Sequence, residues 1–125
     1  NPLVCAAGLA VLQELETRDL VNEADRKGKL FRAELEKIQQ RFSTRIPWIL
    51  GEGMIMAMLF QDPVTYEPDG PFTSRVAERC MQKGLLVVHT GRESLKFGPP
   101  LTISDDALLE GVAVLCESIE EVAAE

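Results

Sequence analysis

The chain has 125 residues, of which 46% are hydrophobic and 26% are charged, and this composition predicts one ordinary globular domain. Its 20 acidic and 13 basic residues give a formal net charge of -7, which would repel the phosphate backbone of a nucleic acid. No apolar run reaches the roughly 18 residues of a membrane span, and no charged-then-apolar leader is present. We therefore expect a cytoplasmic protein with no nucleic-acid and no membrane partner.

The first predicted element is a helix over about residues 2–17. Asn1 suits its N-cap and Pro2 its first position. A natural chain rarely starts on its own helix cap, so either processing of the N-terminus or a cut from a longer protein is expected. Small residues gather on this helix, which predicts close packing against another body. A plain core helix that tolerates one glycine, Gly8, is the alternative.

A second helix is predicted over about residues 22–42, with an apolar stripe at steps of three and four and a charged outer face. At Ile46 the period changes, and strands are expected at about 46–51 and 54–60. The second of these is a near-continuous apolar run, which predicts a strand buried on both faces. Gly51 and Gly53 predict a bend where backbone passes close to another part of the chain.

Residues 62–71 are rich in proline and aspartate and predict a loop. A third helix is expected from about Pro71, capped by Asp69 or Gly70 and ended by Gly84. Strands at 85–89 and 94–97 then flank a turn at 90–93.

Pro99 and Pro100 donate no backbone hydrogen bonds, so the last strand must stop there and a rigid corner follows. Ser104 is predicted to cap a final helix with Asp105 and Asp106 in its first turn and an apolar stripe over 107–122, and the acidic C-terminal end of this helix is expected to fray. The pattern predicts an α+β fold, with a small antiparallel sheet of three to four strands and helices packed on one face.

Candidate functional residues are few. The three cysteines, Cys5, Cys80 and Cys116, lack metal-ligand spacing and are expected to be core thiols of a reducing compartment, and His89 is expected to be structural. Lys96 differs because it stands between apolar residues on the strand that leads into the corner, whereas the other four lysines are expected on polar helix faces or at a helix end. It either points to water or supplies a positive charge to a substrate carboxylate.

Four segments, in order, carry a resemblance to a known family. They are residues 1–7 (Asn-Pro-Leu-Val-Cys-Ala-Ala), residues 51–54 (Gly-Glu-Gly-Met), residues 83–86 (Lys-Gly-Leu-Leu) and residues 96–106 (Lys-Phe-Gly-Pro-Pro-Leu-Thr-Ile-Ser-Asp-Asp). Together they resemble the C-terminal part of class III PLP-dependent aminotransferases. The resemblance implies the C-terminal small domain of a fold-type I PLP enzyme, spanning residues 1–125, with residues 1–20 as a helix that leads toward a missing large domain.

The resemblance implies that Lys96 faces the substrate, where arginine is the commonest residue of the family. A lysine is a point charge and holds a carboxylate with less orientation than the planar fork of arginine. The parent enzyme would use pyridoxal 5'-phosphate (PLP) to transfer an amino group between an amino acid or diamine and a 2-oxo acid, as a homodimer. The lysine that bonds PLP would lie upstream, so we predict no catalytic, cofactor-binding or metal-binding residue here, no PLP on this piece and no activity of it alone.

A second hypothesis belongs to another class of protein. The chain would be a self-sufficient ligand-binding or regulatory α+β module, with a site for an amino acid or anion near Lys96 and Arg92.

Overall fold

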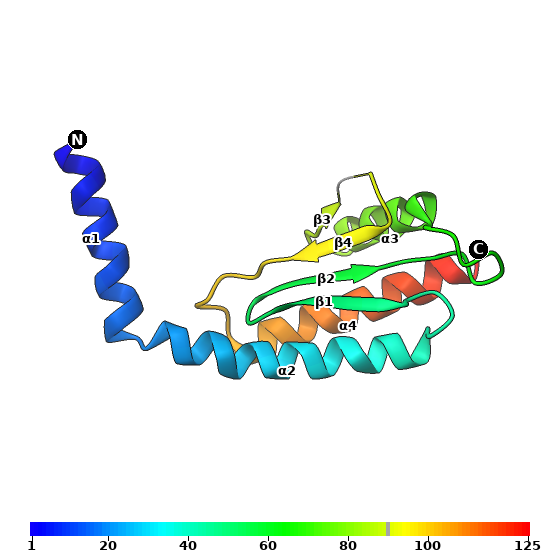
Figure 1. Cartoon of the computed structure of the whole chain (residues 1–125), viewed down its shortest axis with the longest axis horizontal. Helices are drawn as coiled ribbons and strands as arrows, with labels where there is room; N and C mark the ends of the chain where they lie inside the picture. Colours follow the sequence, from blue (N-terminus) through cyan, green and yellow to red (C-terminus); the bar gives the residue numbers. More distant parts are fainter. Residues whose placement is uncertain (90) are drawn as a thin grey trace.

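The computed structural model describes residues 1–89 and 91–125, which form four helices and one four-stranded sheet (Figure 1). In chain order the elements are α1 (Pro2–Thr17), α2 (Leu20–Arg41), β1 (Trp48–Glu52), β2 (Ile55–Leu59), α3 (Gly70–Gln82), β3 (Val88–His89), β4 (Ser94–Phe97) and α4 (Asp105–Ala123). The predicted α+β fold is confirmed.

All strand pairs are antiparallel, in the order β1-β2-β4-β3. Helices α2, α3 and α4 cover one face, as predicted, and the buried side chains of that face are Met56 and Met58 of β2 and Leu95 and Phe97 of β4. The expectation that β2 is buried on both faces is wrong. Side chains alternate along a strand, so Ile55 points to the opposite face and is 75% exposed.

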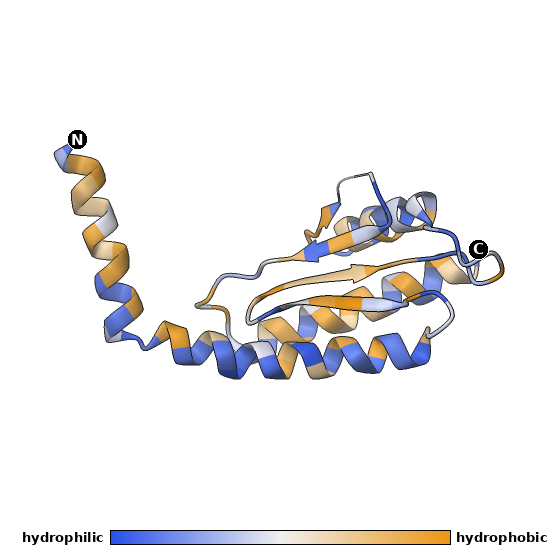
Figure 2. Ribbon diagram, in the orientation of Figure 1, coloured by the Kyte–Doolittle hydropathy of each residue, from blue (hydrophilic) through white to orange (hydrophobic). Residues whose placement is uncertain are grey.

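Helix α1 extends away from the body of the domain (Figure 1), and none of its residues is buried. Its predicted cap is confirmed, because the Asn1 side chain accepts a hydrogen bond from the backbone N–H of Leu3 at 2.9 Å. Figure 2 shows that its N-terminal half is mainly hydrophobic, and Val4 and Leu9 are exposed. The helix therefore carries apolar surface that the described residues leave uncovered.

Strand β3 is shorter than predicted, because residues 85–87 do not pair with β4 and only Val88 and His89 do. Gly84 ends α3 with a φ of +86°, as expected for a residue that follows a helix. The predicted turn at 90–93 includes residue 90, which lies outside the described residues.

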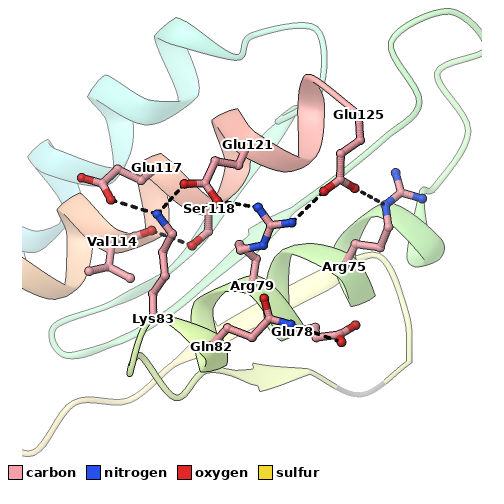
Figure 3. A network of polar contacts seen from close by, with 10 residues as sticks. All are labelled: Arg75, Glu78, Arg79, Gln82, Lys83, Val114, Glu117, Ser118, Glu121 and Glu125. Atoms are coloured by element: carbon pink, nitrogen blue, oxygen red, sulfur yellow. Dashed lines mark hydrogen bonds and ion pairs between the residues drawn. The ribbon is translucent and has the colours of Figure 1, made fainter.

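The acidic end of α4 is held by α3, contrary to the expectation that it frays (Figure 3). Lys83 donates to Glu117 at 3.1 Å and to Glu121, and Arg79 donates to Glu121 and, at 2.7 Å, to Glu125. The dipole of the helix disfavours these carboxylates, but the cations on the neighbouring helix offset that effect. The sequence could not reveal this pairing, because it depends on how α3 and α4 pack.

The glycine bend between β1 and β2 packs directly on α2. A Cβ atom added to Gly28 would lie 2.6 Å from the Cα atom of Gly53, so at this point the backbone of the helix lies directly against the backbone of the hairpin. Gly51 and Gly53 have φ angles of +117° and +57°, and Arg32 of α2 donates to the Gly51 carbonyl. The predicted close approach is confirmed, and its partner is α2.

The substitution Gly28→Ala is expected to lower the free energy of unfolding of this chain by about 1–3 kcal/mol, because the new methyl group has only backbone to displace. Gly8→Ala in α1 is the matched control, since no atom lies within 4 Å of its added Cβ and stability should stay level or rise by up to about 1 kcal/mol. Urea denaturation measures both. Equal stability of the two variants would contradict the close approach of α2 to the hairpin.

The ion pairs between α3 and α4 should make stability depend on pH. Hydrogen bonds from Lys83 and Arg79 hold the pKa of Glu121 below its ordinary value of 4.5, so its contribution is present above pH 4.5 and is lost as the pH falls through the lower pKa of the folded state. The difference in melting temperature between wild type and Glu121→Gln should therefore shrink below about pH 4.5, and also in high salt. Glu110→Gln, on the same helix but with no ion pair among the described residues, should show no such trend; a parallel trend would refute the assignment.

Candidate functional site

Lys96 projects from the uncovered face of the sheet. It lies in β4 between Leu95 and Phe97, which are buried, whereas Lys96 itself is exposed. In the register of the sheet its neighbours are Ala57 of β2 and Val88 of β3, whose side chains lie on the same face. The structure thus places the predicted substrate-binding residue at the centre of an open sheet face.

This open face is largely apolar. Its exposed side chains include Trp48 and Leu50 of β1, Ile55 of β2 and Val88 of β3. Among the described residues, the Lys96 side chain makes no hydrogen bond and no ion pair. A cation without a partner in an apolar surrounding is costly once water is excluded, so this face requires an anion near Lys96 if it becomes covered.

Next to Lys96 lies an open groove of about 320 Å³ with mainly apolar walls. Leu86 and Val88 line it from the β3 segment, Pro99 and Pro100 from the corner, and Gly111 from α4. Among the described residues that line the groove, Lys96 is the charged one. The groove therefore pairs one positive charge with an apolar wall.

The corner after β4 has the predicted form of strand, proline corner and capped helix. β4 ends at Phe97, the N–H of Ile103 donates to the carbonyl of Pro100 at 3.0 Å, and Ser104 accepts from the N–H of Ala107 at 3.2 Å. Neither proline can donate a backbone hydrogen bond. The carbonyl groups of Leu101 and Ile103 take their donor from outside the corner.

Lys27 supplies that donor, and its predicted place on a polar helix face is wrong. The side chain is buried, and its Nζ atom donates to the carbonyl oxygens of Ile103 at 2.6 Å and Leu101 at 3.2 Å. A signal was present in the sequence, because Lys27 lies three residues after Ala24 and four before Phe31 of the apolar stripe. It was missed because a lysine was assumed to face water.

Arg26 makes the adjacent contact with the start of α4. Its guanidinium donates to both carboxylate oxygens of Asp105, at 2.8 and 2.9 Å, and to both of Glu23, at 3.0 and 3.1 Å. These hydrogen bonds raise the pKa of Arg26 and hold the pKa of Asp105 and of Glu23 below their usual values. The first turns of α2 therefore hold both the corner and the helix that follows it.

The remaining candidates do not join Lys96. A ring nitrogen of His89 lies 2.9 Å from the carbonyl oxygen of Arg92, and the Arg92 side chain pairs with Glu93 at 3.6 Å. Of the cysteines, Cys80 is buried and burial raises its thiol pKa, whereas Cys5 is exposed, contrary to its expected place in a core. The described residues contain no group of three or more His, Cys, Asp or Glu side chains placed to hold a metal ion.

Among the described residues, no helix has both the length and the apolar character needed to cross a membrane.

The fold and the corner together define a class of protein. This is the fold of the C-terminal domain of fold-type I PLP enzymes, and the structure superposes with a TM-score of 0.83 on an acetylornithine aminotransferase from Elizabethkingia anophelis, at 28% identity over 97% of this chain and 29% of that one. The TM-score is 0.89 with a phospholyase from Arthrobacter solved with phosphoethanolamine, at 30% identity over 96% of this chain and 29% of that one.

The sequence comparisons give the family. The model of the aminotransferase class-III family matches residues 1–119, and the chain belongs to that family. It is 34% identical over 115 residues to the acetylornithine aminotransferase of Gloeobacter violaceus, which covers 92% of this chain and 27% of that enzyme. It is 32% identical over 126 residues to a 5-aminovalerate aminotransferase of Pseudomonas aeruginosa, which covers 98% of this chain and 29% of that enzyme. The chain spans less than a third of these relatives.

The family depends on PLP, but the described residues do not by themselves fit this cofactor. A PLP site needs a lysine to bond the cofactor and a cradle for its phosphate. The N-termini of α1, α3 and α4 are closed by the side chains of Asn1, Asp69 and Ser104, and the carboxylates of Asp69 and Asp105 would repel a phosphate. Lys27 is engaged by carbonyl groups. We derive no step through PLP from this chain.

Proposed function

We propose that this chain is the C-terminal small domain of a class III aminotransferase, which transfers an amino group between an amino acid or diamine and a 2-oxo acid. The support is its family, its length of less than a third of its relatives, and its uncovered apolar surfaces on α1 and on the open sheet face. Apolar patches of this kind mark surfaces that pack on another body. In this proposal α1 is the linking helix toward the large domain, and residues 1–125 are one small domain.

The observation that carries the proposal is Lys96 on the open sheet face. When the large domain covers that face, the ammonium group loses water and is stable only beside an anion. A substrate that carries an anionic group meets this need, so Lys96 is assigned to substrate binding. Because a lysine acts as a point charge, it can accept a carboxylate or a phosphate with little demand on geometry.

The names of two aminotransferase relatives and the ligand of the phospholyase structure share two chemical groups. Acetylornithine, 5-aminovalerate and phosphoethanolamine each join a primary amine to a carboxylate or a phosphate. We extend this class to the full-length protein that contains this chain. PLP, when bound, supplies the electron sink for the exchange of the amino group. The proposal includes a homodimer in the cytoplasm, where three free cysteines suit a reducing compartment.

The function is tested by trapping the cofactor on the full-length protein. Borohydride reduction of the PLP-loaded enzyme, followed by peptide mass mapping, should fix PLP on one lysine outside residues 1–125, and this chain alone should bind no stoichiometric PLP. Transamination is assayed with acetylornithine, 5-aminovalerate and phosphoethanolamine as donors and 2-oxoglutarate or pyruvate as acceptor. PLP trapped stoichiometrically at Lys96 would overturn the domain assignment.

The role of Lys96 is tested by charge. Lys96→Met in the full-length protein should raise KM for the anionic donor about 10- to 100-fold, the cost of one charge-assisted hydrogen bond, whereas Lys96→Arg should retain most binding. Because Lys96 is exposed and unpaired among the described residues, Lys96→Met should change the stability of this chain by less than about 0.5 kcal/mol. An unchanged KM would refute the substrate role, and a large loss of stability would indicate a structural role instead.

A further inference from the structure

The contact of Lys27 with the proline corner has no counterpart elsewhere among the lysines of the described residues. Lys29 and Lys37 hold single carboxylates on exposed helix surface, and Lys83 holds the end of α4. Of these lysines, only Lys27 is buried, with 7% of its surface exposed. Its Nζ atom donates to two backbone carbonyls and forms an ion pair with Glu23 at 3.7 Å. A buried ammonium group is costly, and well-formed hydrogen bonds at a fixed geometry are what offsets that cost.

The carbonyls that Lys27 holds belong to the segment directly after Lys96. Between Lys96 and Leu101 stand Phe97, Gly98 and the two prolines, and neither proline can donate a hydrogen bond to fix the segment. Among the described residues, this segment contains one internal backbone hydrogen bond, from the N–H of Ile103 to the carbonyl oxygen of Pro100. The position of the segment relative to α2 therefore depends on side chains of α2.

The same helix also contacts Phe97, the residue that directly follows Lys96. Phe31 follows Lys27 by one helical turn, and its ring meets the ring of Phe97 edge to face, with centroids 5.8 Å apart. One face of α2 thus contacts the residue next to Lys96 through Phe31 and the corner beyond it through Lys27. Arg26 binds Asp105 further along and closes the corner from the other end.

We propose that Lys27 is a positioning residue for Lys96, which fixes the proline corner so that the Lys96 ammonium group points at the substrate anion. This inference rests on the proposed function, since it assumes that Lys96 binds the substrate. An apolar side chain could fill the same space and avoid the cost of a buried charge, but it could not orient the carbonyls of Leu101 and Ile103. The positioning of the corner is what the lysine adds.

The test uses the full-length, PLP-loaded protein and whichever of acetylornithine, 5-aminovalerate or phosphoethanolamine it turns over. Lys27→Met should raise KM for that donor about three- to tenfold with kcat changed less than about twofold, because Lys96 is held less well. Lys29→Met is the matched control, the same substitution two residues away on an exposed side chain, and should leave KM unchanged. In the double variant Lys27→Met/Lys96→Met, the first substitution should add nothing to the KM of Lys96→Met alone.

A second measurement does not depend on activity. Hydrogen–deuterium exchange of the full-length protein should be faster in the peptide over residues 97–104 of Lys27→Met than in wild type or Lys29→Met, since the corner loses its donor. If Lys27→Met does not fold, Lys27→Gln, which keeps one donor pair without the charge, should show the same changes at smaller size.

The outcomes separate the two proposals. If Lys96→Met leaves KM unchanged, the substrate role of Lys96 fails. If Lys96→Met raises KM but Lys27→Met does not, or if the two effects multiply fully in the double variant, Lys96 binds the substrate and the positioning role of Lys27 is overturned. Unchanged exchange over residues 97–104 would also overturn it.

Discussion

The side-chain hydrogen bonds from α2 to the proline corner are the interaction on which the rest of this domain depends. Two consecutive prolines end β4 and deprive the chain of the backbone donors that would otherwise fix its next turn. Lys27 and Arg26 replace them with side-chain donors to Leu101, Ile103 and Asp105. The corner leads into α4, which starts at Asp105, while pairing with β2 sets the register that places Lys96 on the uncovered face.

The unequal covering of the sheet follows from the same arrangement. Helices α2, α3 and α4 occupy one face, where the side chains of β2 and β4 form the core, and leave the other face open. A domain built to stand alone would place polar residues on its open face, whereas this one places Trp48, Leu50 and Ile55 there and adds an apolar α1 without buried residues. The chain spans less than a third of the relatives it matches, and in our proposal these uncovered apolar surfaces pack on the rest of the enzyme.

Local chemistry in the sequence predicted the local structure well. The caps at Asn1 and Ser104, the end of α3 at Gly84 and the strand from Ser94 to Phe97 each follow from the backbone preferences of a few adjacent residues. What failed depends on parts of the chain that are distant in sequence. An apolar run could not tell whether a second layer covers β2, the acidic end of α4 could not reveal the cations of α3, and Lys27 could not show that two carbonyls would receive it. The placement of Lys96 on a strand was predictable, but its isolation on an apolar face was not.

Two lysines of this domain differ in how their charge is satisfied. Lys27 is buried and its charge is satisfied by the fold itself, through two carbonyls and a nearby Glu23. Lys96 is held by the fold on a rigid strand, yet the described residues give its charge no partner. In our proposal the unpaired Lys96 charge binds the anionic group of the substrate, and the fixed backbone of β4 lowers the cost of orienting it.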